Sequence, residues 1–401
     1  MALDNFKEVF SDSYQDIFQK VLVGLKVANT TLRSGLRYGE SVTRIKYDIA
    51  NVLVRSVTIG SDRTVDSITD SEELLAVDQK YGTTFAISVY EKVQAGPLSP
   101  ATVLGAKVAH KLAEFIDADI LGETVNAFST FDTGDLTATT SSGVAITLSS
   151  TTVPQLVSRA PAKLRANNQT LTNLCFVVDS YAAASMTEYL LGKNIDLAGS
   201  TYANGYTGTV STAEVYVSEN LTGTAVLSLA TNVTADDTIS VEGVTFTAKA
   251  TPAVAGEFDV AGSADATRAI IANAINGSAT GQDSATGYFE VSAANRAILT
   301  NARIVATNDD TANTLTIVGK GAGRLTVAET LTDATDAWTS NYISCYFGKK
   351  GAIDVVIQDQ VDMEMRDEPK QRAINVLADA LYGFKTFNDG AQQFLNVKIA
   401  A

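Results

Sequence analysis

Hydrophobic residues recur every three or four positions in several stretches of this 401-residue chain, the spacing that marks one face of an α-helix. The first such stretch predicts an amphipathic helix over residues 3–27, with Phe6, Phe10 and Phe18 on its apolar face. A terminal helix of this kind needs a surface that covers the apolar face. The chain's own core and a neighbouring subunit are both open as that surface.

The longest predicted helix covers residues 101–123 and follows Pro97-Leu-Ser-Pro100. Ser99 suits a helix cap, and Pro100 suits the first turn. About 24 residues would span roughly 36 Å at 1.5 Å per residue. Helical spacing also predicts shorter helices over residues 153–165, 181–191, 263–275 and 368–383.

Other stretches alternate or are continuously apolar, which is typical of β-strands. The runs 52–59 and 81–90, joined by a polar stretch, predict an extended hairpin, and a lone hairpin is only marginally stable in water. If this hairpin projects from the body, something else must cover it, which is a first indication of assembly. Further strands are predicted at residues 174–178, 237–248 (with a tight turn at Glu242-Gly243), 288–292, 297–306, 314–318, 342–347, 352–357, 361–366 and 394–399.

Residues 221–340, called the module below, differ in composition from the rest of the chain. They are rich in Ala, Thr, Asp, Asn, Gly and Val and poor in aromatic residues. Several strands and one capped helix predict a compact β-rich unit that could fold by itself. The earlier composition returns after Trp338, so the module interrupts a host domain that resumes at about residue 341.

The net charge and the small numbers of His and Cys residues exclude several classes of function. With 30 basic and 45 acidic residues the formal net charge is −15, which argues against a protein that grips nucleic acid phosphates. A single His removes most histidine-based catalysis and most zinc sites. Cys175 and Cys345 suit small buried hydrophobes better than a disulfide. Because the sequence has neither a stretch of roughly 18 apolar residues nor a signal-peptide pattern, we expect it to fold in the cytoplasm.

Three motifs invite a chemical interpretation, and each has a simpler structural one. Gly319-Lys-Gly-Ala-Gly-Arg324 departs from the phosphate-loop patterns and predicts a hairpin turn between two strands. His110 lies on the long predicted helix with no nucleophile or metal partner at a readable spacing. The acidic stretch from Asp62 to Glu73 lacks ligand spacing and predicts a solvated loop. The sequence therefore assigns no catalytic residue, no cofactor and no metal site, and it does not support an enzyme.

The order of these elements resembles the major capsid protein of tailed double-stranded DNA bacteriophages, which has the HK97-type fold. Residues 73–89 are similar to the strand that returns from the family's extended loop, and residues 104–122 to its spine helix. Residues 174–181 are similar to the axial-domain strand and helix, and residues 208–221 to a short strand and the turn after it. Residues 366–383 also fit. The resemblance covers the chain outside the module.

The resemblance implies an α+β fold of HK97 type with an N-terminal arm, an extended β-hairpin loop, a long spine helix, an axial α/β domain and an inserted β-rich domain. The module stands where P22-like coat proteins carry their insertion domain. The implied boundaries are 1–40 for the arm, 41–97 for the extended loop and peripheral-domain strands, 98–125 for the spine helix, 126–220 for the axial domain, 221–340 for the inserted domain and 341–401 for the return through the axial and peripheral domains.

The implied function is that of a coat protein that self-assembles as hexamers and pentamers into the icosahedral shell of a virion. The shell would enclose double-stranded DNA without sequence-specific binding. The implied partners are further copies of the chain, a separate scaffolding protein and a portal protein, with a decoration protein left open and no membrane involved. A tail-tube or other virion structural protein, and a host-surface-binding module, remain as alternatives. The predicted intersubunit contacts are the arm helix with Phe6, Phe10 and Phe18, the extended loop over about residues 50–80, and the axial-domain loops around 195–205. Within the extended loop, the predicted contact residues are Asp62, Arg63 and Asp66.

Overall fold

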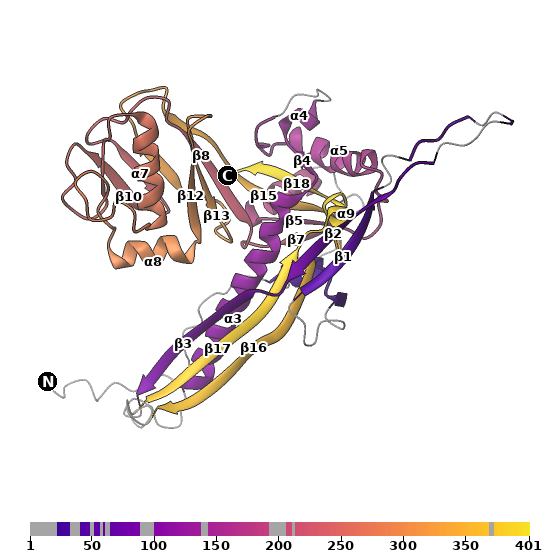
Figure 1. The fold of residues 1–401 in the computed structure, drawn as a ribbon, viewed down its shortest axis with the longest axis horizontal. Coiled ribbons are helices and arrows are strands. Elements are labelled where there is room, and N and C mark those ends of the chain that lie inside the picture. Colours follow the sequence, from indigo (N-terminus) through magenta and orange to yellow (C-terminus); the bar gives the residue numbers. More distant parts are fainter. Residues whose placement is uncertain are drawn as a thin grey trace.

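The helix α3 (Pro100–Gly122) runs through the middle of the molecule, and the other elements are arranged around it (Figure 1). The computed structural model describes residues 22–32, 41–48, 52–56, 59–60, 65–88, 100–137, 143–191, 206–210, 213–368 and 373–401. The helix predicted over 101–123 is confirmed to within one residue at each end. The arm helix predicted over 3–27 lies mostly outside the described residues, and the described part contains the short helix α1 (Gly24–Val27).

A long antiparallel sheet of three strands lies along α3, in the order β16-β17-β3 (Figure 1). Its strands are β3 (Gln79–Ser88), β16 (Asp354–Glu368) and β17 (Ala373–Lys385). The two strands predicted at 352–357 and 361–366 are parts of the single strand β16. This sheet and α3 together form the long, narrow part of the molecule.

The helix predicted over residues 368–383 is wrong, because most of this stretch is the central strand β17. The strand pairs with β16 on one edge and with β3 on the other. Apolar residues at every second position from Ile374 to Tyr382 fit a strand as well as they fit helical spacing. Pairing on both edges supplies the backbone hydrogen bonds and outweighs the local helical preference.

The extended loop is a two-stranded antiparallel ribbon that projects from the body (Figure 1). Its strands are β1 (Ser41–Asp48) and β2 (Thr69–Ala76), with Ser41 opposite Ala76 and Asp48 opposite Thr69. The predicted pairing of residues 52–59 with 81–90 is wrong. Residues 52–56 are not in a strand, and residues 79–88 pair with β17 instead. The chain leaves the ribbon at Val77-Asp78, so the returning run belongs to two different sheets.

A second sheet has nine strands, with the path β12-β13-β8-β15-β5-β7-β6 and with β18 and β4 beside β15. Its strands are β4 (Ser129–Phe131), β5 (Leu174–Val178), β6 (Tyr206–Val210), β7 (Ala213–Val217), β8 (Thr222–Ser228), β12 (Ile304–Asp309), β13 (Thr314–Gly319), β15 (Ala337–Lys349) and β18 (Phe394–Ala400). The strands predicted at 174–178, 314–318, 342–347 and 394–399 are confirmed.

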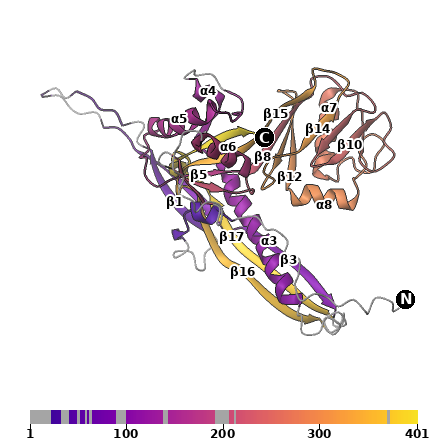
Figure 2. The same ribbon diagram turned by 180° about the vertical axis from the view of Figure 1, so that it is seen from behind.

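The main hydrophobic core lies where this sheet packs against α3 and against the two helices α5 and α6. The predicted helices over 153–165 and 181–191 are confirmed as α5 and α6, and Figure 2 shows both from behind. All five residues of β5 are buried in this core, as their continuous apolar run predicts. Outside the module, the structure also describes the 3-10 helix η2 (Glu123–Asn126), α4 (Thr133–Leu136), α5 (Thr152–Ala166), α6 (Ser180–Leu191) and α9 (Asn388–Ala391).

The module contains a second hydrophobic core, separate from the first. A four-stranded sheet in the order β11-β10-β9-β14 forms one side of it. The module strands β8, β12 and β13 belong to the nine-stranded sheet, where β8 pairs with β15, so the two cores share one sheet. The remaining elements of the module are β9 (Thr238–Val241), β10 (Val244–Lys249), β11 (Glu257–Asp259), α7 (Ala264–Asn276), α8 (Ala293–Asn301) and β14 (Val327–Thr330).

Of four elements that the sequence predicts in the module, two are confirmed and two are wrong. The helix predicted over 263–275 is confirmed as α7, capped by the Ser263 hydroxyl and ended by Gly277 in the left-handed conformation. The tight turn at Glu242-Gly243 is confirmed, with both residues at positive φ. The strand predicted at 297–306 is wrong, because α8 reaches Asn301 and β12 begins only at Ile304. The strand predicted at 288–292 is also wrong, because this stretch makes only isolated bridges at Tyr288.

Candidate assembly surface and its anchoring

The extended loop carries the largest group of exposed apolar side chains in the described chain. Nine exposed large hydrophobic residues lie between positions 45 and 74, against eight in the rest of the described residues. A concentration of exposed apolar side chains on a projecting ribbon is typical of a protein–protein contact. The nine residues are Ile45, Tyr47, Val52, Leu53, Val54, Ile59, Val65, Ile68 and Leu74.

The base of the loop is fixed to the body by a small core and an ion pair. Leu75 is fully buried with Val356 and Phe387. Nη1 of Arg44 lies 3.2 Å from Oδ2 of Asp354, and the Arg44 guanidinium lies 4.5 Å from the centre of the Phe387 ring. Burial of Asp354 is the main reason that the pKa of its carboxyl is raised. These contacts hold the ribbon at its root and leave the rest of it exposed.

Farther out, the loop is braced by an ion pair between its two arms. Both guanidinium nitrogens Nη1 and Nη2 of Arg55 donate to the Asp66 carboxylate at 2.8 Å, and the Leu53 N–H donates to it at 2.9 Å. The bonds from Arg55 lower the pKa of the Asp66 carboxyl and raise the pKa of Arg55. Asp66 therefore has a partner within its own loop. The other predicted contact residues, Phe6, Phe10, Phe18, Asp62 and Arg63, and the loops around 195–205, lie outside the described residues.

A buried carboxylate on α3 joins three parts of the chain. Oδ1 of Asp119 accepts a hydrogen bond from Nη2 of Arg303, in the module, at 2.5 Å. Oδ2 accepts a hydrogen bond from the Tyr382 hydroxyl, on β17, at 2.5 Å. Burial, and the bond to this carboxylate, raise the pKa of Tyr382 well above its usual value. Asp119 thus connects α3 to the module on one side and to the three-stranded sheet β16-β17-β3 on the other.

A second buried carboxylate on the same helix holds the N-terminal segment. Oδ1 of Asp117 accepts the backbone N–H groups of Val23 and Gly24 at 2.8 and 2.5 Å. Oδ2 of Asp117 accepts a hydrogen bond from Nδ2 of Asn220, the residue just before the module, at 2.8 Å. Neither Asp117 nor Asp119 stands out in the sequence as a functional residue. The available signal was two acidic residues among the apolar positions of a helix, since buried charges need partners.

Burial raises the pKa of the Asp117 carboxyl above its ordinary value. The folded state therefore binds the proton more tightly than the unfolded state, so this group's stabilisation is present at low pH and is lost as pH rises through the folded-state pKa. We expect Asp117→Asn to remove this part of the pH dependence, which has a slope of at most about 1.4 kcal/mol per pH unit. Urea unfolding of both proteins at several pH values measures the difference, and identical slopes would contradict the assignment.

The glycine-rich segment 319–324 packs closely against α3. Its prediction as a hairpin turn is wrong. The strand β13 ends at Gly319, and the next strand, β14, pairs with β9 in the other sheet. Gly321 has a φ of 75°, and a Cβ there would lie 2.6 Å from the Cβ of Ala118 on α3. Nε of Arg324 donates to Asp179 at 2.5 Å, beside α6. The segment thus contacts α3 through Gly321, and it contacts the residue before α6 through Arg324.

The remaining candidate groups have structural surroundings. Cys175 and Cys345 are buried free thiols, as predicted, and burial raises the pKa of Cys175 to about 12. Nε2 of His110 lies 3.6 Å from Oε1 of Glu114, one helical turn away. The described residues contain no cluster of three or more His, Cys, Asp or Glu placed to hold a metal ion. Among the described helices, none combines the length and hydropathy needed to cross a bilayer.

Comparison with known proteins adds to this geometry. No family model and no curated protein matches the sequence. Solved structures match it over nearly its full length. The capsid of cyanophage P-SCSP1u is 12% identical with a TM-score of 0.53, covering 99% of this chain and 94% of that one. The chain has an HK97-type capsid fold.

Two further structures share this capsid fold. One, from Mycobacterium phage Che8, is 14% identical with a TM-score of 0.53, covering 98% of this chain and 97% of that one. The mature capsid of bacteriophage PhiM1 is 11% identical with a TM-score of 0.50, covering 98% and 91%. Identities this low establish the fold alone. That α3 corresponds to the spine helix of this fold, and the β1-β2 ribbon to its extended loop, stays a prediction.

Proposed function

We propose that this chain is a phage major capsid protein that assembles as hexamers and pentamers into an icosahedral shell around double-stranded DNA. One observation carries the proposal: a chain with the HK97-type fold exposes nine large apolar residues on its extended loop. The matching capsid structures favour this function over the alternatives of a tail-tube subunit and a host-surface-binding module.

The physical argument for a shell comes from the ribbon itself. A two-stranded ribbon with exposed apolar residues is marginal in water, and neighbouring subunits in a closed assembly can cover it. Each such contact can be weak, because every subunit makes several of them at once. A net charge of −15 fits an enclosure that does not hold DNA tightly on its wall.

The partners follow from the same proposal. Besides other copies of itself, the subunit would require a separate scaffolding protein and a portal protein, with a decoration protein left open. The shell would be assembled in the host cytoplasm and become part of the virion. We also propose that residues 221–340 act as an inserted domain, and that Phe6, Phe10, Phe18, Asp62, Arg63 and Asp66 contribute to subunit contacts.

Sedimentation of the expressed protein, followed by negative-stain imaging of the fastest fraction, tests the proposal. We expect closed shells or shell fragments, with scaffold supplied where it is needed. A monomer or small oligomer with and without scaffold would count against a capsid protein. Open tubes would favour the tail-tube alternative or a coat protein that has lost control of curvature.

We expect Ile45→Ser to weaken assembly. The side chain is 55% exposed in the single chain, so its full burial by a neighbour would contribute about 0.8–1.7 kcal/mol per contact. The concentration needed for assembly should therefore rise roughly 4-fold to 20-fold. Light scattering against protein concentration measures it. Val254→Ser, at an equally exposed position in the module, is the matched control and should assemble like the wild type.

A further inference from the structure

Four buried polar side chains near the end of α3 have no hydrogen-bond partner within the described part of the chain. They are the hydroxyls of Thr124, Thr222 and Ser344 and the amide oxygen of Asn396, and none of the four residues is more than 5% exposed. An unpaired polar atom in a protein interior costs free energy, so buried polar groups in native proteins almost always have a partner. These four groups therefore call for one.

The strand register places three of the four side chains on one face of the nine-stranded sheet. Thr222, the first residue of β8, stands directly opposite Ser344 on β15. On the other edge of β15, Tyr346 stands opposite Asn396, so Asn396 on β18 is the diagonal neighbour of Ser344. Cross-strand partners point to the same face of a sheet. The side chains of Thr222, Ser344 and Asn396 therefore lie next to one another.

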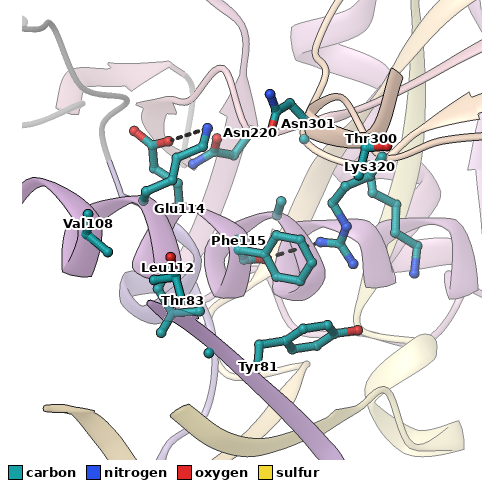
Figure 3. A pocket seen from close by; sticks show the side chains of 15 residues that line it. Tyr81, Thr83, Val108, Leu112, Glu114, Phe115, Asn220, Thr300, Asn301 and Lys320 are labelled. Carbon is teal, nitrogen blue, oxygen red and sulfur yellow. Dashed lines mark hydrogen bonds and ion pairs between the residues drawn. The ribbon is translucent and has the colours of Figure 1, made fainter. Parts of the chain in front are cut away.

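The end of α3 covers this part of the sheet. A Cβ on Gly122, the last residue of α3, would lie 3.6 Å from Oγ1 of Thr222 and 3.8 Å from Cδ of Lys320. The helix η2, which carries Thr124, follows Gly122 directly and packs on β15 and β18. Lys320 also lines a cavity of about 300 Å³ beside α3, which Figure 3 shows. The polar groups thus lie between the sheet and the point where α3 passes into η2.

Water suits these groups better than an ion does. Each hydroxyl can both donate and accept a hydrogen bond, and the amide oxygen accepts, which matches the two to four partners that a buried water needs. Opposite side chains in a sheet have Cβ atoms about 4.5–5.5 Å apart, a gap that a bridging water can span. None of the four groups is a carboxylate, and Lys398 stands opposite Ser344. A buried cation would therefore find no counter-charge among them.

We propose that the sheet, η2 and the end of α3 enclose a site for bound water, held by Thr222, Ser344 and Asn396 together with Thr124 of η2. The strand β8 leads the chain into the module, whereas β15 and β18 belong to the body. The bound water therefore links the start of the module to the body strands and to the end of α3. One buried water per roughly 27 residues is usual, so a chain of this length has room for such a site.

A crystal structure of the full chain, at a resolution that shows ordered water, tests the site directly. We expect density about 2.7–3.2 Å from the hydroxyl oxygens of Thr222 and Ser344. Hydroxyls that turn to protein partners, with no density between them, would overturn the proposal. Crystals grown with rubidium bromide distinguish water from an ion, because an anomalous rubidium or bromide peak at this place would also overturn it.

The melting temperature of Thr222→Val, measured by calorimetry on the unassembled subunit, is a second test. Valine keeps the shape of the side chain and removes the hydroxyl, so the loss of a bond to water should lower the melting temperature by roughly 2–4 °C. Ser344→Ala should lower it as well. Removing a hydroxyl that has no partner would instead be neutral or stabilising, so an unchanged or higher melting temperature would contradict the site.

Thr245→Val, at an exposed threonine of β10, is the matched control for exchanging threonine for valine in a strand, and it should have little effect. If a variant fails to fold, the density in the wild-type crystal decides. Neither test depends on assembly, so the site and the capsid function can fail separately.

Discussion

Replacing Asp119 by alanine is expected to lower the free energy of unfolding by about 3–5 kcal/mol, the usual cost of breaking a buried ion pair from one side. The substitution leaves the Arg303 guanidinium and the buried Tyr382 hydroxyl without the acceptor that both use at 2.5 Å. Because these groups come from the module and from β17, the helix loses a connection to each. We therefore expect contacts of both elements with α3 to loosen together.

Urea unfolding of the unassembled subunit measures this loss. Asp119→Asn is the matched control, because it keeps an acceptor oxygen for one partner while it removes the charge and replaces the other oxygen by an NH2 donor, so its cost should be smaller. Hydrogen exchange should rise in α8, near Arg303, and in β17 for the alanine variant. A loss below about 1 kcal/mol, typical of an exposed ion pair, would contradict the role assigned to this carboxylate.

The elements that the sequence predicted well are those specified by neighbouring residues. The helix α7 carries its own start and stop, Ser263 and Gly277, and both act as expected. Glu242-Gly243 adopts the turn that its residue types favour. The continuous apolar run of β5 is buried along its whole length, because the strand lies inside a sheet. In each case the deciding interactions lie within a few residues of each other.

The failures are elements that distant partners decide. Residues 373–385 form a strand because β16 and β3 flank them, and nothing within the stretch itself specifies those neighbours. The run 81–90 was assigned to the wrong partner for the same reason. The α8 to β12 region has both helical and strand-like spacing, and a break at Arg303, at positive φ, separates the two elements. Local periodicity cannot choose between such alternatives.

In the candidate site, too, the features set by neighbouring residues are predictable from the sequence, and those set by distant partners are not. The need of the extended loop for cover follows from sequence alone, because a hairpin cannot bury its own apolar residues, whereas the strands that form the loop do not follow from it. The anchoring carboxylates do not, since the partners of Asp119 are 184 and 263 positions away in the chain. The cavity that Tyr81, Phe115 and Lys320 line beside α3 is likewise invisible in the sequence, because these residues meet only in the folded protein.

Replacing Phe258 by alanine is expected to cost about 3–5 kcal/mol, the range for removing a fully buried phenylalanine. Phe258 is completely buried in the module core, on β11, where it pairs with Ala248 and bridges to Tyr288. Its strand belongs to the four-stranded sheet, which has no strand in common with the nine-stranded one. We therefore expect exchange protection to fall in β9, β10 and β11 while β5 keeps its protection.

This result would bear directly on whether residues 221–340 are a domain of their own. The shared strands β8 and β15 provide a route by which damage in the module could spread to the main core. Phe131→Ala is the matched control, because Phe131 is equally buried but lies in the main core, on β4. Opposite patterns of lost protection in the two variants would support two units. The same loss across both cores in each variant would mean that the chain unfolds as one cooperative unit and that the module is no separate domain.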